Sequence, residues 1–169
     1  GSRSLPGALP IVTMVSAEVL FVQGGRKLEG EVEVQGAKNA VLPMLAASLL
    51  ASEGQTVLHR VPPVKDVLVA LEVLRRLGAR VDYDMTEETV VIDARDVDDH
   101  RLPPELTNRF RASLLFVGPL LARFRRAWVS EVGGCTIGSR PADYHYRGFA
   151  RLGAEVGGVV GGGIDVVAK

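Results

Sequence analysis

The chain has a single cysteine, which lies in the segment EVGGCTIGSRP at residues 131–141. Cys135 follows two glycines, and Arg140 stands five residues after it. A nearby cation lowers the pKa of a thiol, and the thiolate is the nucleophilic form. This pattern favours Cys135 as a nucleophile or a proton donor. The alternative is a small buried hydrophobic residue, which is the common role of a free cysteine.

Two further cations stand where a helix is expected to begin. Lys38-Asn39 follows Gly36-Ala37, and Arg111 opens an apolar stretch. The first backbone N–H groups of a helix attract anions, and a cationic side chain at the same place adds charge to the site. We therefore expect the Lys38 ammonium and the start of its helix to face one anion.

Arginines are concentrated ahead of Glu131. Five of them, and no acidic residue, lie between Glu105 and Glu131. Such an asymmetry suits phosphate recognition through charge-assisted hydrogen bonds, and it equally suits a helix end in water. For Arg123, Arg125 and Arg126 we favour the solvated helix end.

Composition excludes several classes of protein. The 169 residues are 47% hydrophobic and 24% charged, which is typical of a globular domain. Twenty basic residues balance twenty acidic ones, so no net positive field favours nucleic acid or an anionic membrane surface. One cysteine allows no internal disulfide, and the histidines are too scattered for a metal site. No metal and no cofactor is predicted.

The chain ends and apolar runs predict a cytoplasmic protein. Residues 1–18 show no periodic pattern, and Gly1-Ser2 is typical of a trimmed expression tag, so the folded part is expected over 19–169. The longest apolar stretch, 112–122, is too short to span a bilayer and predicts a buried helix.

Hydrophobic periodicity predicts alternating strands and helices. A hairpin around the Gly24-Gly25 turn is expected over 19–36. Helices are expected over 40–51, 66–77, 111–122 and 144–152. Strands are expected over 55–61, 79–83, 89–93, 127–132, 154–156 and 164–168.

The sequence contains an internal repeat. LGARV at 77–81 and LGAEV at 152–156 lie 75 residues apart, and each precedes an apolar strand. We predict two copies of a β-α-β-α-β-β unit, over 19–97 and 98–169. Repeat units bury their helices against neighbouring units, so two copies are expected to be incomplete. The glycine-rich stretch 157–163 predicts a mobile hairpin turn.

Several segments resemble the N-terminal portion of the enolpyruvyl transferase family, in particular the UDP-N-acetylglucosamine 1-carboxyvinyltransferases. They are QGAKNAVLPMLAASLLA, VIDARDV, FRASLLFVGPLLARF and GGCTIGSRPADYH, within 21–156. The resemblance implies an α/β fold in which three repeat units form an inside-out α/β barrel, with substrates bound between two barrels. It also implies transfer of the enolpyruvyl group of phosphoenolpyruvate to the 3-hydroxyl of UDP-N-acetylglucosamine, the first committed step of peptidoglycan synthesis.

The resemblance implies roles for single residues. Cys135 takes the place of the cysteine that protonates phosphoenolpyruvate, binds it covalently and is alkylated by fosfomycin. Lys38, Asn39 and Arg140, together with Cys135, match residues at the phosphoenolpyruvate site. The residues that match the UDP-N-acetylglucosamine site are Asn39, Arg111, Arg140, Pro141, Ala142, Asp143 and Tyr144.

The chain matches under half of that family's architecture. The base that acts on the sugar hydroxyl, further arginines and the second domain are absent from the sequence, so we expect no turnover by this chain alone. Uncovered strand edges predict self-association, or pairing with the missing C-terminal part. The alternatives are another acceptor, such as shikimate 3-phosphate, and a non-catalytic anion-binding or assembly module of the same fold.

Overall fold

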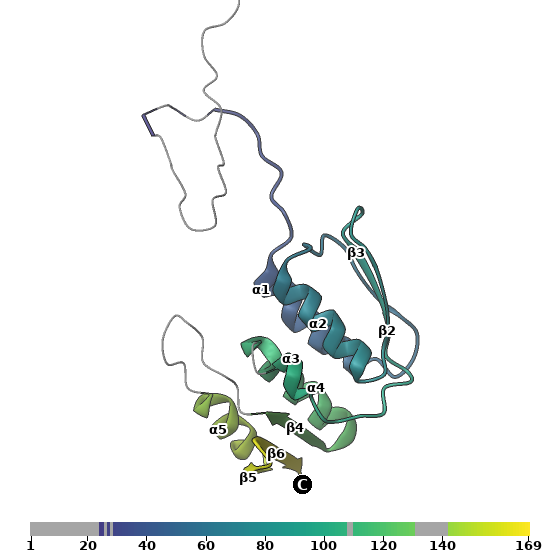
Figure 1. The fold of residues 1–169 in the computed structure, drawn as a ribbon, viewed down its shortest axis with the longest axis vertical. Helices are drawn as coiled ribbons and strands as arrows, with labels where there is room; N and C mark the ends of the chain where they lie inside the picture. Colours follow the sequence, from purple (N-terminus) through teal and green to yellow (C-terminus); the bar gives the residue numbers. More distant parts are fainter. Residues whose placement is uncertain (1–23, 26, 28, 108–109, 131–141) are drawn as a thin grey trace, which may run out of the picture. The chain divides into compact units, whose positions relative to one another are not determined.

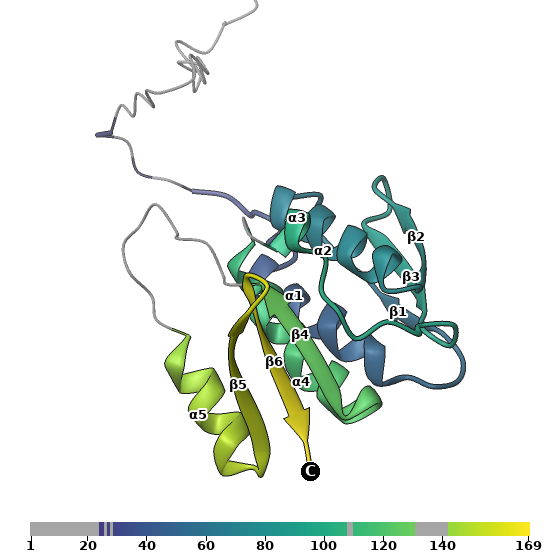
Figure 2. The same cartoon turned by 60° about the horizontal axis from the view of Figure 1, so that its bottom comes forward.

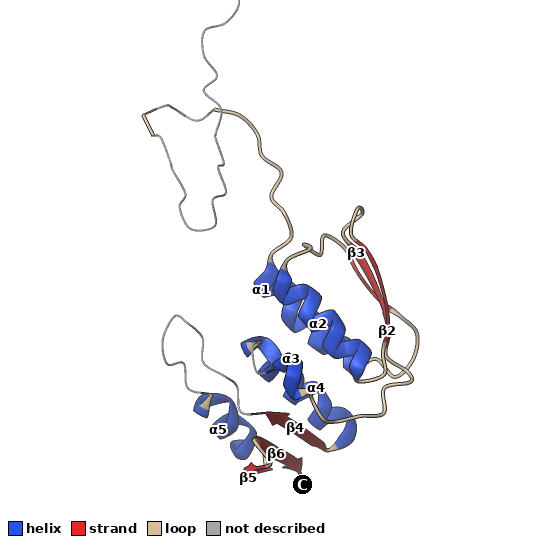
Figure 3. Cartoon of the chain, viewed as in Figure 1, coloured by secondary structure: helices blue, strands red, loops and turns tan. Residues whose placement is uncertain are grey.

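The structure is a computed structural model that describes residues 24, 25, 27, 29–107, 110–130 and 142–169. The chain forms two compact units, residues 1–33 and residues 34–169. The described residues of the first unit contain no helix or strand. The second unit is an α/β fold with two small sheets, shown by secondary structure in Figure 3.

The first half of the second unit runs helix, strand, helix and hairpin. Its three strands form an antiparallel sheet in the order β1-β3-β2. The elements are α1 (Lys38–Ala47), the 3-10 turn η1 (Ser48–Leu50), β1 (Thr56–Leu58), α2 (Lys65–Arg76), β2 (Arg80–Asp84) and β3 (Thr89–Asp93).

The second half repeats this plan after a short helix. Its sheet has the order β4-β6-β5 and is again antiparallel, so the two halves share one order of paired strands (Figures 1 and 2). The elements are α3 (Pro104–Thr107), the 3-10 turn η2 (Arg111–Ser113), α4 (Leu114–Phe124), β4 (Arg126–Ser130), α5 (Asp143–Arg151), β5 (Ala154–Val160) and β6 (Gly163–Ala168).

Helix α2 shows how local sequence sets an element and its end. Its apolar stripe is fully buried, and its last turn closes with two backbone hydrogen bonds, from Gly78 to Arg75 and from Ala79 to Leu74. Gly78 has φ of +104°, a left-handed conformation that glycine adopts without strain. This is the Schellman ending, so the predicted stop at Gly78 is confirmed.

The structure confirms the helices predicted over 40–51, 66–77, 111–122 and 144–152 and the strands predicted from 55 onward, with shifted ends. The last two residues of the strand predicted over 127–132 lie outside the described residues. The strand predicted over 89–93 is β3 with the same bounds. Helix α3 was not predicted, because its four residues are too few to show a helical period.

The hairpin predicted over 19–36 is wrong in its second arm, and its first arm lies outside the described residues. Residues 29–36 form no strand, although their apolar and polar residues alternate. Val32 and Val34 are 87% and 78% exposed. A strand needs a neighbouring strand to form a ladder, and none of the described strands pairs with this segment.

The glycine-rich stretch 157–163 is a hairpin, but most of it is strand rather than turn. Strand β5 continues to Val160, with an irregular register between Val156 and Val159, and only Gly161 and Gly162 form the turn. Glycine is required just past the turn, since a Cβ on Gly163 would lie 2.3 Å from the Trp128 ring. Gly161 and Gly162 therefore form the turn, whereas Gly163 allows close packing against the Trp128 ring.

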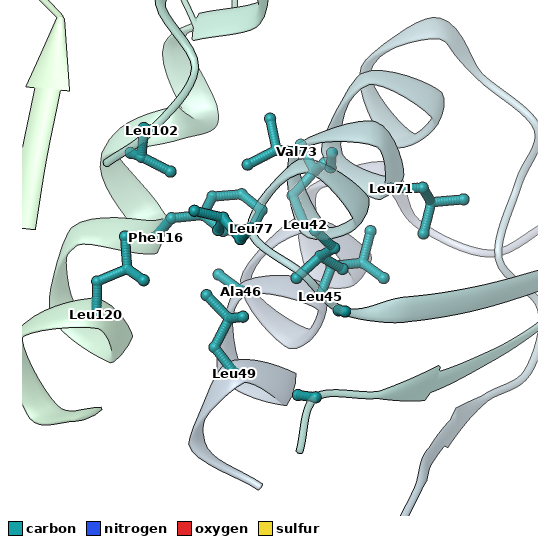
Figure 4. Packing of buried hydrophobic residues seen from close by; sticks show 14 of the residues in the cluster. Leu42, Leu45, Ala46, Leu49, Leu71, Val73, Leu77, Leu102, Phe116 and Leu120 are labelled. Carbon is teal, nitrogen blue, oxygen red and sulfur yellow. The ribbon is translucent and has the colours of Figure 1, made fainter. Parts of the chain in front are cut away.

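One continuous apolar core joins the two halves (Figure 4). Helix α1 packs against both α2 and α4. Ten residues labelled in Figure 4 come from both halves: Leu42, Leu45, Ala46, Leu49, Leu71, Val73, Leu77, Leu102, Phe116 and Leu120. The stretch predicted as a buried helix is α4, and none of the described helices is long and apolar enough to cross a membrane.

Arg123 also joins the halves, and the prediction that it lies on a solvated helix end is wrong. Its Nη1 donates to the carbonyls of Leu49 (3.0 Å) and Ala51 (3.4 Å). Its Nη2 donates to the carbonyls of Arg95 (3.1 Å) and Val97 (3.3 Å). The carbonyls at the end of η1 lack helical partners, so the guanidinium satisfies groups that sequence position alone does not bring near it.

Two ion pairs hold the ends of strands. Arg95 binds the carboxylate of Asp93 through two nitrogens, at 3.0 and 2.6 Å, and these hydrogen bonds lower the pKa of Asp93 to about 2. Arg126 binds Asp165 across β4 and β6 in the same manner, and the pKa of Asp165 is lowered. Arg126 is thus a sheet residue, whereas Arg125 is exposed at the end of α4.

Replacing Arg123 by methionine is expected to destabilise the second unit. Methionine keeps much of the aliphatic stem but leaves four carbonyls without their donor, at a cost of about 2–4 kcal/mol in the free energy of unfolding. Urea unfolding followed by circular dichroism measures this cost. Arg151→Met, at an exposed position of α5, is the control and should change the free energy by under about 0.5 kcal/mol. Equal effects of the two substitutions would contradict the joining role of Arg123.

Candidate functional site

Lys38 and Asn39 open helix α1, as predicted. The residue before them, Ala37, offers no side-chain cap, and its carbonyl accepts from the amides of Ala40 and Val41 at 3.0 Å. The helix itself gives no partner to its first N–H groups. The side chain of Asn39 is exposed. The start of α1 thus has the donors and the positive dipole end that suit an anion.

The Lys38 ammonium has a partner that sequence analysis missed. Its Nζ lies 2.8 Å from Oδ2 of Asp66, in the first turn of α2, and the two side chains are 45% and 43% exposed. The starts of α1 and α2 therefore lie side by side. The two residues are 28 positions apart in the sequence, and no local pattern indicated this contact.

A close approach of backbone segments positions the start of α1. A Cβ on Gly36 would lie only 1.6 Å from the Arg60 carbonyl oxygen, so only glycine fits there. In the same place Arg60 donates from Nη2 to the Val34 carbonyl at 2.6 Å. The chain entering Lys38 is therefore held against the segment that follows β1.

Arg111 begins the short turn η2, which leads directly into α4. Its side chain is partly buried. This placement confirms that Arg111 stands at a helix start, as Lys38 does. Lys38 therefore stands at the start of α1, and Arg111 stands just before α4. These two helices pack against each other in the core.

The cysteine loop connects two elements that the structure describes. Cys135, Arg140 and Pro141 lie outside the described residues. Before the loop, β4 ends at Ser130, whose buried Oγ lies 2.7 Å from Oγ1 of Thr107. After the loop, α5 begins at Asp143. The last described residue before Cys135 is therefore a buried strand end.

The start of α5 carries the remaining predicted contacts. Ala142 precedes the helix, and its carbonyl accepts from the amides of His145 (3.0 Å) and Tyr146 (3.3 Å). Asp143 stands in the first turn. Tyr144 is 76% exposed, with the Arg147 guanidinium 5.8 Å from the centre of its ring. These residues are brought together at one helix start, as their sequence order requires.

The predicted site residues that the structure describes stand at or beside helix starts. Among the described residues no group of His, Cys, Asp and Glu could hold a metal ion. Two open hollows occur, of about 240 Å³ beside Trp128 and about 350 Å³ beside Phe149. Neither is lined by a predicted site residue.

The order of helices and of the strands in the two sheets is the basis for comparing this chain with solved structures. The solved structure of the enolpyruvyl transferase NikO from Streptomyces tendae matches 86% of this chain and 31% of its own chain, at a TM-score of 0.71 and 27% identity. The fold is that of an enolpyruvyl transferase. The sequence model of the EPSP synthase (3-phosphoshikimate 1-carboxyvinyltransferase) family matches residues 22–166, so the chain belongs to that family.

Its curated relatives include UDP-N-acetylglucosamine 1-carboxyvinyltransferases. The protein of that name from Thermobifida fusca (strain YX) is 53% identical over 138 residues, which are 80% of this chain and 32% of the relative. The one from Dichelobacter nodosus (strain VCS1703A) is 51% identical over 82% of this chain and 33% of the relative. The resemblance read from the motifs is confirmed. The chain spans about a third of the length of these relatives.

Substituting Gly36 by alanine is expected to disturb the start of α1. The added Cβ would collide with the Arg60 carbonyl, so the backbone must shift, at a cost of about 1–3 kcal/mol in the free energy of unfolding. Thermal unfolding measures the cost, and amide NMR shifts of Lys38 and Asn39 report the displacement. Gly148→Ala is the control, because a Cβ at Gly148 in α5 meets nothing within 4 Å. An unchanged stability and spectrum for Gly36→Ala would contradict the close approach.

Proposed function

We propose that this chain is part of an enzyme that transfers the enolpyruvyl group of phosphoenolpyruvate to the 3-hydroxyl of UDP-N-acetylglucosamine, with release of phosphate. The observation that carries the proposal is the identity of about half the residues, over four fifths of the chain, with proteins named for that activity. The reaction is the first committed step of peptidoglycan synthesis and belongs to the cytoplasm. Its partners are the two small-molecule substrates.

The proposed phosphoenolpyruvate site uses Lys38, Asn39, Cys135 and Arg140. Phosphoenolpyruvate carries a phosphate and a carboxylate, and charge-assisted hydrogen bonds from lysine and arginine neutralise such groups. The uncapped start of α1 adds backbone donors beside Lys38. Fixing both anionic ends brings the reacting carbon into attack geometry, which is where most of the rate enhancement of a bimolecular reaction originates.

The proposed nucleotide-sugar site extends from the same residues to the start of α5. Asn39, Arg111 and Arg140 would contact the sugar and the diphosphate. The contacts nearer the uridine would come from Pro141, Ala142, Asp143 and Tyr144. Asp143 and Tyr144 are exposed in the first turn of α5, so their side chains are accessible to a ligand.

Cys135 is the proposed proton donor. Its thiol gives a proton to C3 of phosphoenolpyruvate, while the sugar 3-hydroxyl oxygen bonds to C2 and loses its own proton to a base. Phosphate then leaves with the electrons of its bond to C2, and loss of a proton from C3 restores the double bond. A thiol can serve both the proton transfer and, as the thiolate, covalent addition to C2.

The chain alone is proposed not to turn over. It spans about a third of the relatives' length, and none of the residues proposed for its sites is the base for the sugar hydroxyl. In this proposal the chain contributes two of the three repeat units of one inside-out barrel. The remaining unit and the second barrel would cover it, through the missing C-terminal part or through self-association.

A second candidate is an enolpyruvyl transferase that uses shikimate 3-phosphate. The name of the matching family, 3-phosphoshikimate 1-carboxyvinyltransferase, favours it. The loop GGCTIGSRP is the feature that distinguishes the two candidates, because the resemblance ties it to the nucleotide-sugar enzymes. A non-catalytic module of the same fold needs no activated thiol.

Fosfomycin alkylation tests the proposed function. In this reaction the thiolate sulfur attacks an epoxide carbon, a C–S bond forms, and the C–O bond of the ring breaks. We expect the intact mass of the wild-type chain to show one adduct, formed faster with UDP-N-acetylglucosamine present. Cys135→Ser should show none.

Two results would contradict this assignment. An unmodified wild-type mass after prolonged incubation would mean that this chain carries no working cysteine site. Acceleration by shikimate 3-phosphate in place of the nucleotide sugar would favour the second candidate.

A further inference from the structure

The ion pair between Lys38 and Asp66 links the starts of two helices. Lys38 Nζ and Asp66 Oδ2 are 2.8 Å apart, and both side chains are a little under half exposed. Asp66 is not among the residues that the family resemblance assigns to a substrate. Its carboxylate nevertheless binds the ammonium that is proposed to hold phosphoenolpyruvate.

The packing of α1 on α2 does not need this pair. Exposed ion pairs contribute little to stability, because water screens them and two long side chains must be ordered. The two helices are instead held by fully buried residues, among them Leu45 on α1 and Leu71 and Leu74 on α2. The ion pair is therefore free to serve another purpose.

Asp66 is a fixed acceptor, whereas lysine is a flexible donor. Asp66 stands in the first turn of α2, where the helix dipole favours a negative charge. The helix that carries it is anchored by its buried stripe. Lysine places a compact charge on a four-carbon stem with many rotamers, so an acceptor at a fixed place removes much of that freedom.

The pair leaves donors available for a ligand. An ammonium has three N–H groups, and one of them suffices for the contact with Asp66. The other two can reach an anion beside the first turn of α1. A ligand that binds there gains an ammonium that is already ordered, and this lowers the entropic cost of binding.

We infer that Asp66 is a positioning residue, which holds the Lys38 ammonium beside the start of α1 for a phosphate-bearing anion. This inference rests on the proposed function, in which Lys38 binds phosphoenolpyruvate. Asp66 acts through Lys38 and need not touch the ligand. Its own negative charge repels the anion, so the role requires that ordering of the ammonium outweighs that repulsion.

NMR of the 169-residue chain tests the inference, because only four lysines contribute side-chain signals. The order of the Lys38 ammonium is followed through its labelled Cε and Nζ without ligand. Phosphoenolpyruvate and inorganic phosphate are then titrated, and dissociation constants are taken from the amide shifts of Lys38 and Asn39. The variants are Asp66→Ala, Asp66→Glu and Lys38→Met. Asp96→Ala is the control, since it breaks the comparable ion pair with Arg80.

We expect Asp66→Ala to loosen the Lys38 signals before any ligand is added. It should also weaken phosphoenolpyruvate binding about fivefold, which is the effect of one exposed charge contact. Asp66→Glu should restore binding to within about twofold, because its carboxylate can still reach the ammonium. Asp96→Ala should leave both measurements unchanged, and unaltered core amide shifts in Asp66→Ala would show that it folds.

The possible failures are distinguishable. Unchanged Lys38 order in Asp66→Ala overturns the positioning role whatever the binding data show. Equal or tighter binding by Asp66→Ala, with binding lost in Lys38→Met, also overturns it but leaves the proposed role of Lys38 intact. Equal binding by Lys38→Met and wild type, or no binding by wild type, overturns the proposed anion site and the inference together.

Discussion

The Arg123 guanidinium ties the second half of the second unit to the backbone of its first half. From α4 it reaches the carbonyls at the end of η1 and those of the loop after β3. That loop is itself shaped by the ion pair between Asp93 and Arg95. Around these contacts the apolar faces of α1, α2 and α4 close into one core. Two similar units of helix and sheet thereby become a single folded body.

This core decides where chemistry can occur. Helices α1 and α4 each bury one face in this core, which places Lys38, Asn39 and Arg111 at the points where the chain enters the two helices. The sheets act as supports, and β4 ends at the buried Ser130 just before the cysteine loop. The described cations Lys38 and Arg111 stand at helix starts, whereas Cys135 lies outside the described residues.

Sequence reasoning succeeded where a local pattern determines the structure. The stripe of α2, the glycine that ends it and the alternation in β3 each depend on neighbouring residues. It failed where distant partners decide. The alternating segment 29–36 forms no strand, and Arg123 turned out to bind carbonyls far away in the sequence. For the same reason Asp66 gave no signal as a partner of Lys38, whereas motif resemblance identified Lys38 itself.

The central claim is that Lys38 and Cys135 serve one anion site although they come from different halves. The most direct measurement is the rate of fosfomycin alkylation of Cys135 in Lys38→Met, with Lys65→Met as a neighbouring control. Loss of a charged hydrogen bond to the bound phosphonate predicts a rate about tenfold below wild type, with Lys65→Met unchanged. Alkylation of Lys38→Met at the wild-type rate would contradict a shared site.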